Sequence, residues 1–132
     1  MPTDRNRTAL AAEFFVAAEL LRQGHIVTIT FGKEKAVDLL VCHKDDNSIA
    51  RSIDVKGLAK KNPWALGTFD KPQMPSFFVF CLLNTPGEQP RYFIVPSSDV
   101  NNLVEPASNR KSYWIPFNKV VDYESRWELL WE

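Results

Sequence analysis

The chain has 132 residues, of which 45% are hydrophobic, and its 16 basic residues balance 16 acidic residues. We expect one domain over residues 1–132, because a chain of this length can bury roughly two thirds of its unfolded surface in a single core. The balanced charge lacks the basic excess that is usual for proteins that coat nucleic acids or bind anionic membranes, so a polyanionic partner would have to meet a local patch.

Residues 8–23 are rich in Ala and Leu and are followed by Gly24, which predicts a helix that ends there. Glu13 falls at the border of the apolar side of this helix, where a carboxylate is costly unless something binds it. At 100° per residue, that apolar side is predicted to contain Leu10, Phe14, Ala17, Ala18 and Leu21.

Three runs rich in β-branched residues, 25–30, 36–42 and 49–56, predict strands. Residues 45–47 separate the last two, and Asn47 suits the left-handed third position of a three-residue hairpin loop. The two strands are therefore expected to be antiparallel neighbours. In the register that this loop sets, Asp38 lies directly across from Asp54.

Residues 57–76 contain three prolines and are predicted to be mostly loop, of a length that suggests a functional role. Strands are expected over 77–83 and 91–95, followed by a short helix over 99–104 capped by Ser97 or Ser98. The chain closes on 113–116 and a predicted helix over 123–132. The late anchors of that helix, Trp127, Leu130 and Trp131, are expected to dock on the sheet, with a seam between two copies as the alternative.

Cys42 and Cys81 lie in apolar runs without metal-binding spacing, which favours buried, reduced thiols. His25 and His43 stand alone at strand edges and are expected to be structural or surface residues. No signal peptide or membrane span is recognisable, since no window reaches the roughly 18 apolar residues that a span needs. These features predict a cytoplasmic protein without membrane contact.

The predicted hairpin gathers three charges. Strand alternation puts Asp54 and Lys56 on one face, and the register places the Cβ atoms of Asp38 and Asp54 about 4.5–5.5 Å apart. Two carboxylates this close repel each other unless a cation lies between them, and oxygen ligands select a hard ion such as Mg²⁺. The neighbouring ammonium of Lys56 could hold a water or neutralise a phosphate oxygen.

This pattern resembles the PD-(D/E)xK nuclease superfamily, and within it archaeal Holliday-junction resolvases and small restriction-endonuclease-like proteins. Asp38 in AVDLLV matches the first acid of the motif, and Asp54-Val55-Lys56 matches the triplet, with Asp where Glu is commoner. Glu13, in EFFVAAELLRQGH, matches the helix-borne acid of the resolvases. Val37 stands where the family often has Pro, and residues 57–76 look poor in helix where the family has one.

The resemblance implies an α/β fold, a restriction-endonuclease-like mixed β-sheet flanked by helices. It implies hydrolysis of DNA phosphodiester bonds with Mg²⁺ or Mn²⁺, on duplex or branched DNA, with RNA left open as a substrate. Glu13, Asp38 and Asp54 would hold the metal, and Lys56 would assist the attacking water. A homodimer is compatible with the family and with the wide apolar arc of the first helix.

Residues 57–76 offer a candidate nucleic-acid contact in Lys60, Lys61, Trp64 and Lys71, since basic and aromatic side chains can follow a backbone and stack on bases. The alternative, which we favour, is a solvated loop pinned by Trp64.

Two rival hypotheses remain open at this point. One is a catalytically silent nuclease-fold module that binds nucleic acid or a protein partner. The other is a structural or interaction protein in which the carboxylates are only surface groups, with Asp38 and Asp54 apart and solvated. Taken singly, Asp54 with Lys56 could be a surface ion pair, and Glu13 could be neutralised by Arg51 or Lys35.

Overall fold

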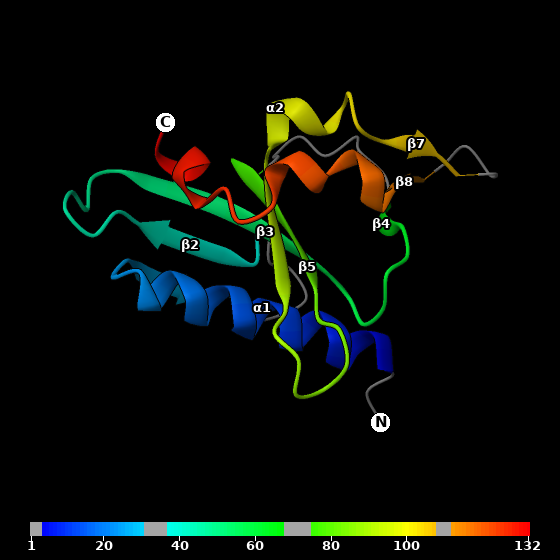
Figure 1. The fold of residues 1–132 in the computed structure, drawn as a ribbon. Coiled ribbons are helices and arrows are strands. Elements are labelled where there is room, and N and C mark those ends of the chain that lie inside the picture. The colour runs from blue at the N-terminus through cyan, green and yellow to red at the C-terminus, as the bar shows by residue number, and fades with distance from the viewer. Residues whose placement is uncertain (1–3, 31–36, 68–74, 108–111) are drawn as a thin grey trace.

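The computed structural model describes residues 4–30, 37–67, 75–107 and 112–132. Its centre is a five-stranded sheet in the order β1-β2-β3-β5-β6, in which β3 and β5 are parallel and the other neighbours are antiparallel. The helix α1 runs along one side of this sheet, and β4, β7 and β8 lie together on the other side of the molecule (Figure 1). The predicted class, an α/β fold with a mixed sheet flanked by helices, is confirmed, with α1 as the one long helix among the described residues. The strands of the central sheet are β1 (Ile26–Ile29), β2 (Leu39–Cys42), β3 (Ala50–Leu58), β5 (Phe77–Leu82) and β6 (Arg91–Pro96).

The helix α1 spans Asp4–Arg22 and ends where the sequence predicts, because Gly24 adopts a φ of +97° that few other residues tolerate. The predicted buried side is wrong except for Ala17. The residues on the buried side are Ala12, Glu13, Val16, Ala17 and Leu20. The exposed side instead carries Leu10, Phe14, Ala18 and Leu21. Since α1 is apolar around most of its circumference, periodicity could not indicate which side faces the sheet.

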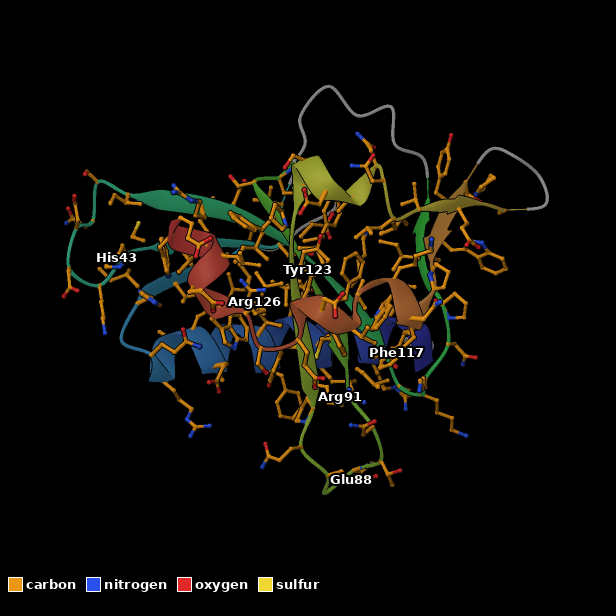
Figure 2. All side chains as sticks on the ribbon, turned by 45° about the horizontal axis from the view of Figure 1, so that its top comes forward. His43, Glu88, Arg91, Phe117, Tyr123 and Arg126 are labelled. Carbon is orange, nitrogen blue, oxygen red and sulfur yellow. The ribbon has the colours of Figure 1, made fainter. Side chains whose placement is uncertain are left out.

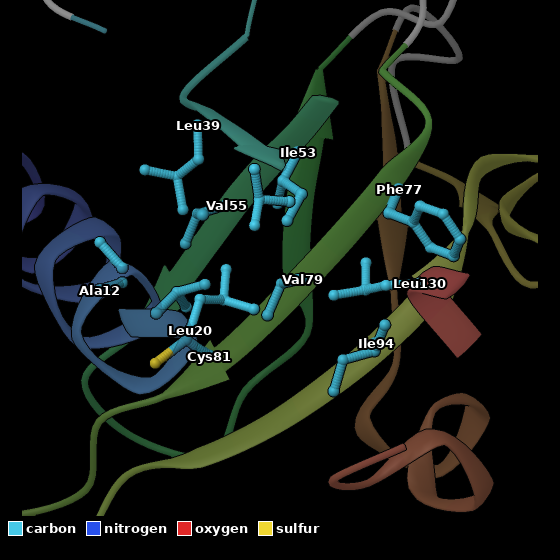
Figure 3. Packing of buried hydrophobic residues seen from close by; sticks show 13 residues of the cluster. Ala12, Leu20, Leu39, Ile53, Val55, Phe77, Val79, Cys81, Ile94 and Leu130 are labelled. Carbon is cyan, nitrogen blue, oxygen red and sulfur yellow. The ribbon is translucent and has the colours of Figure 1, made fainter. Parts of the chain in front are cut away.

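The first core cluster lies between α1 and the sheet. Val16 and Leu20 of α1 pack against Val55 of β3 and Val79 of β5, and the C-terminal Leu130 closes the cluster (Figure 3). A second cluster covers the opposite face of β5 and β6, and its central side chains are Trp64, Phe80, Phe93, Val95 and Ile115. The first cluster thus lies on the α1 face of the sheet, whereas the second covers the opposite face over β5 and β6 and leaves Leu40 of β2 exposed.

The hairpin of β2 and β3 has the predicted register and a different turn. Leu39 pairs with Ile53 and Cys42 with Ala50, so counting outward places Asp38 opposite Asp54. The turn is closed by Ile49, whose N–H donates to the main-chain oxygen of Asp46 at 3.0 Å. Asn47 is not left-handed, because Asn84 and Ser125 are the non-glycine residues with positive φ in the described parts of the chain. In place of the expected left-handed Asn47, the Asp46 carboxylate stabilises the turn by accepting hydrogen bonds from Ser48.

The segment predicted as a loop, 57–76, is partly strand. Residues 57 and 58 complete β3, and Trp64–Gly67 forms β4, which pairs with β8 (Tyr113–Ile115), itself paired with β7 (Glu105–Pro106). Trp64 is 1% exposed, stacks on Phe117 and contacts Phe80 with tilted rings. The interpretation that Trp64 pins this segment is confirmed. Residues 68–74 lie outside the described parts of the chain.

The helix predicted over 99–104 is shorter and begins earlier, as α2 (Ser97–Val100). Neither predicted serine caps it through a side-chain hydrogen bond, because Pro96 holds the N-cap position and the Ser97 hydroxyl donates to the main-chain oxygen of Pro75 at 2.5 Å. Ser97 therefore ties α2 to the residues that precede β5.

The chain ends in three short 3₁₀ helices, η1 (Phe117–Lys119), η2 (Val121–Tyr123) and η3 (Trp127–Trp131), and η3 lies where a helix was predicted over 123–132. Arg91 of β6 binds Glu124 through two hydrogen bonds of 2.7 and 2.8 Å, and its guanidinium lies 5.2 Å from the centre of the Phe117 ring (Figure 2). The expected docking of the terminal segment is confirmed, because Leu130 is completely buried in the first core.

Trp131 contacts two imidazoles at the turn end of the β2–β3 hairpin. Its ring centre lies 4.8 Å from that of His25 and 4.8 Å from that of His43. The Nδ1 atom of His25 accepts a hydrogen bond from the Lys44 N–H at 3.1 Å, and Arg51 donates its Nε to the main-chain oxygen of Leu130 at 2.7 Å. Both histidines are therefore structural, as the sequence predicts.

Cys42 and Cys81 are free thiols, as predicted, although Cys42 is only half-buried. Burial raises the pKa of Cys81 to about 12, so this thiol is not reactive at neutral pH. Within the described residues, no helix combines the length and hydropathy that crossing a bilayer requires.

Gly57 lets α1 approach β3 closely, and we expect Gly57→Ala to lower the free energy of unfolding by about 1–3 kcal/mol. A Cβ at this position would lie 2.6 Å from the Cβ of Ala12 and 3.1 Å from the main-chain oxygen of Thr8. Urea denaturation measures the loss. In an Ala12→Gly background the same substitution should cost less, because one of the two colliding atoms is gone; equal costs in both backgrounds would contradict this contact.

Acid should loosen the docking of the C-terminal segment. The pKa of His25 is lowered, first by burial and then by the charges of His43 and Lys44, against a raising effect of Asp45. Its stabilising contribution is therefore complete above the ordinary pKa of 6.5 and is lost as the pH falls below that value. Protonation would also turn Nδ1 into a donor, facing the Lys44 N–H.

We expect the unfolding free energy of the wild type to fall more steeply between about pH 7 and about pH 5 than that of His25→Asn, which keeps an acceptor but does not titrate. Urea denaturation followed by tryptophan fluorescence compares the two. Parallel pH profiles would show that His25 does not control this docking.

Candidate functional site

The candidate site is built on the edge between β2 and β3, where the main-chain ladder ends. Leu39 and Ile53 are the last pair of the ladder. Beyond them, the Asp38 side chain continues the pairing, because its Oδ2 accepts the Val55 N–H at 2.7 Å. Asp38 is therefore held at this position by a charge-assisted hydrogen bond to the neighbouring strand.

Strand β1 holds Asp38 from its other side. The main-chain oxygen of Asp38 accepts a hydrogen bond from the Thr30 N–H at 3.0 Å. The Thr30 hydroxyl donates to the main-chain oxygen of Val37 and also lies 3.1 Å from the main-chain oxygen of Asp38. Thr30 was not singled out by the sequence. The β1–β2 register, which places Thr30 opposite Asp38, is the signal that could have found it.

Asp54 and Lys56 point to the face of the sheet opposite α1, because Ile53 and Val55 alternate with them and belong to the first core. The Nζ of Lys56 lies 3.4 Å from Oδ1 of Asp54. Their side chains are only 26% and 14% exposed, so the ion pair is less screened by solvent than an ordinary surface pair.

The pKa of Asp54 is raised to about 6. Burial is the largest cause; Lys56 opposes it, whereas the charge of Asp38 and a hydrogen bond with that carboxyl add to it. Asp38 and Asp54 therefore interact directly, as the predicted register requires. Asp54 is still largely ionised at neutral pH and lies beside a second carboxyl. A cation bound between the two would reduce their repulsion.

The site lies at the border between the covered and the open part of this sheet face. On the β5 side, Phe78 and Phe80 are next to Asp54 and Lys56 in register and are buried in the second core. On the β2 side, Leu40 is 43% exposed. Among the described residues, this face is therefore covered on the β5 side of the carboxylates and exposed at Leu40 on the β2 side.

Glu13 is buried, with 6% of its surface exposed, but it lies on the α1 side of the sheet. Residues 4–30, 37–67, 75–107 and 112–132 contain no group of three His, Cys, Asp or Glu side chains that could hold a metal ion. The structure thus brings Asp38, Asp54 and Lys56 together and does not group Glu13 with them. Glu13 as a third metal ligand stays a prediction.

The candidate nucleic-acid contacts are placed differently from one another. Lys60 and Lys61 are exposed after β3, and the Nζ of Lys61 lies 4.3 Å from the centre of the Phe117 ring. Trp64 is buried, so the predicted stacking of a base on this ring is wrong for this structure. Lys71, and Lys35 as a partner of Glu13, lie outside the described residues.

Two serines border the site without having been singled out for it. The Ser76 N–H donates to the hydroxyl of Ser52 at 2.8 Å, and the two hydroxyl oxygens are 3.3 Å apart. Ser52 lies two residues before Asp54 on the same face of β3. This contact joins β3 to the start of β5 next to the carboxylates.

The fold is similar to that of a solved protein described as a bacterial homing endonuclease, I-Ssp6803I. The TM-score is 0.62 with 16% sequence identity, over 98% of this chain and 92% of the other. At this identity the likeness shows a shared fold. No protein-family model matches the sequence, and a search of curated protein sequences finds no match.

We expect Asp54→Asn to stabilise the protein at neutral pH. A raised carboxyl pKa means that the folded state holds its proton more tightly than the unfolded chain does. The stability that protonated Asp54 contributes is therefore present below about pH 4 and is lost as the pH rises through about 6. The substitution removes that loss, and the gain at about pH 8 should be on the order of 1–3 kcal/mol.

Urea denaturation of wild type and variant at several pH values gives this difference. Asp46→Asn is the matched control with the opposite sign, because hydrogen bonds from Ser48 lower the pKa of the fully exposed Asp46. A destabilised Asp54→Asn protein at high pH would show that the ion pair with Lys56 outweighs the burial of the charge.

Proposed function

We propose that this protein is a metal-dependent nuclease that hydrolyses phosphodiester bonds in DNA. The observation that carries the proposal is the contact of Asp38 and Asp54 on one face of the sheet, with Lys56 at 3.4 Å from Asp54. The fold shared with a protein described as a bacterial homing endonuclease supports it. The order of the residues along the chain also matches the PD-(D/E)xK pattern.

The residues present fit a hard divalent cation. Mg²⁺ is commonly bound through one or two carboxylates together with waters and substrate phosphates, so two aspartates are a sufficient donor set. The pKa of Asp54 is raised by burial and by the nearby Asp38 carboxyl despite the ion pair with Lys56, and Mg²⁺ or Mn²⁺ would offset both effects. Such an ion supplies polarisation of the scissile phosphate and a lowered pKa of bound water.

The residues of the chain would divide the remaining work. Asp38, fixed by the Val55 N–H through Oδ2, presents its other carboxylate oxygen in a set direction. Lys56 would orient the attacking water or neutralise a phosphate oxygen, because its ammonium is held next to Asp54. Glu13 is proposed as a further ligand. Lys60, Lys61 and Lys71 are proposed to contact the backbone of the substrate.

The test is cleavage of plasmid, linear and branched DNA, and of RNA, with Mn²⁺ or Mg²⁺ and with chelator. We expect Asp54→Asn and Lys56→Ala to lower the rate at least 100-fold, while Asp46→Asn, an acid in the hairpin turn, leaves it unchanged. Substrates left equally intact by wild type and variants would contradict the proposal.

Calorimetric titration with Mn²⁺ separates the ligands. Asp54→Asn should abolish binding, and Glu13→Gln should weaken it only if the helix supplies a ligand. Wild-type protein that binds DNA but neither ion would support the second candidate, the silent module. The balanced charge of the chain favours that candidate, as does the lack of a three-ligand group among the described residues. The two free thiols agree with a cytoplasmic location for either.

A further inference from the structure

Two serine hydroxyls next to the candidate site are bound to each other's main chain. The Ser76 N–H donates to the Ser52 hydroxyl at 2.8 Å, and the Ser52 N–H donates to the Ser76 hydroxyl over a long 3.5 Å. The pair stands where the parallel ladder of β3 and β5 begins, since Ile53 and Phe77 are its first partners. Side chains therefore replace the ladder on this edge of β3, as the Asp38 carboxylate does on the other edge.

Ser76 is fixed from two sides. Its main-chain oxygen accepts the Ser97 N–H at 3.1 Å, and the Ser97 hydroxyl donates to the main-chain oxygen of the preceding residue, Pro75. On the other side, its N–H is bound to Ser52 of β3. The position of the Ser76 hydroxyl is therefore set by β3 and α2 together, and not by the side chain alone.

The two hydroxyls have more protons than the pair uses. Each oxygen accepts one main-chain N–H, and their separation of 3.3 Å allows one hydroxyl to donate to the other. That contact is long, because an O–H···O hydrogen bond normally measures about 2.7–2.8 Å. Among the described residues, neither hydroxyl has a further acceptor. The pair can therefore offer at least one O–H to an acceptor outside the chain.

This donor lies on the same face of the sheet as the carboxylates. Ser52 precedes Asp54 by two residues, which puts them about 7 Å apart along β3, and Lys56 follows at the same spacing. Ser76 is exposed, and Leu40, the partner of Ser52 on β2, is 43% exposed. Asp54 thus has hydrogen-bond donors on both sides along the strand, an ammonium on one and neutral hydroxyls on the other.

We propose that the Ser76 hydroxyl, held in place by Ser52, binds a backbone phosphate of the nucleic acid, next to the phosphate at the candidate site. This rests on the proposed function, because Asp54 and Lys56 define where the scissile phosphate lies. A single nucleotide can span the distance from Ser52 to Asp54, so the two contacts hold successive phosphates of one strand. Half or more of the hydrogen bonds between proteins and DNA go to phosphate and sugar oxygens, and serine hydroxyls are among their donors.

A neutral donor suits this position better than a cation does. A basic side chain in place of Ser52 would lie beside Asp54, as Lys56 does, and would compete with a divalent ion for that carboxylate. A hydroxyl binds a phosphate oxygen without this competition. The chain as a whole has no excess of positive charge, with 16 basic and 16 acidic residues, so neutral contacts are expected to carry part of its affinity for a polyanion.

Fluorescence anisotropy with labelled DNA in the presence of chelator measures this contact without hydrolysis. We expect Ser76→Ala to raise the Kd about ten-fold, because a hydrogen bond to a charged group is lost. The slope of log Kd against log salt concentration should not change, since a hydroxyl displaces no counterion. Ser76→Thr, which keeps the hydroxyl, should bind as the wild type does. Ser48→Ala is the matched control, an exposed serine in the hairpin turn whose hydroxyl is bound to Asp46.

Ser52 is a positioning residue in this proposal, and its variants test that role. Ser52→Ala should show the same loss of affinity as Ser76→Ala, because the Ser76 N–H loses its acceptor. Ser52→Thr should restore binding. Circular dichroism and urea denaturation establish that each variant is folded. In cleavage assays with Mn²⁺, Ser76→Ala should raise KM about ten-fold and change kcat less than three-fold, as expected for a contact made equally in the ground state and the transition state.

The outcomes separate this subsite from the proposed hydrolysis. Cleavage by the wild type with an unchanged Kd and KM in Ser76→Ala overturns the subsite and leaves the hydrolysis standing. A wild type that cuts nothing, but whose DNA binding Ser76→Ala weakens, supports the subsite on a silent module. A loss that comes with a smaller salt slope, or on only one of two DNAs of different base composition, overturns the phosphate contact. A wild type that neither binds nor cuts DNA overturns both.

Discussion

The hydrogen bond from the Val55 amide to the Asp38 carboxylate joins the architecture of the sheet to the candidate site. It takes the place of a main-chain bond at the point where β2 leaves the ladder, and so an acidic side chain serves as part of the sheet. Because Val55 is also a core residue that packs under α1, the position of Asp38 depends on the packing of the first cluster. The candidate chemistry is therefore supported by the most buried part of the molecule.

The close approach of α1 to β3 is a second link between the packing of the core and the candidate site. Gly57 follows Lys56 directly, and it is the missing side chain at Gly57 that lets Ala12 rest on the strand. Helix and site thus share one short stretch of β3. The charged residues lie on one face of that stretch, and the glycine that admits the helix serves the other face.

The central hairpin was predictable from sequence because side-chain alternation and loop length together fix a register, and the pairing of Asp38 with Asp54 follows from that arithmetic alone. The structure of the turn was not predictable, since it is stabilised by side-chain hydrogen bonds between Ser48 and Asp46 and not by a left-handed residue. The inward side of α1 was mistaken because its sequence is apolar on both sides. The position of Glu13 relative to the two aspartates depends on that rotation and on the sheet twist, neither of which a local pattern encodes.

One consequence of the long strand β3 concerns how the candidate site can change while the fold is kept. Ile53 and Val55 alternate with Asp54 and Lys56, so sliding β3 by a single residue would carry the carboxylate and the ammonium into the hydrocarbon interior and expel two aliphatic groups into water. Displacement of the reactive groups is thereby coupled to collapse of the whole domain. The candidate site can therefore be altered by exchanging one side chain for another, while the positions of Asp54 and Lys56 on their face of β3 are preserved together with the fold.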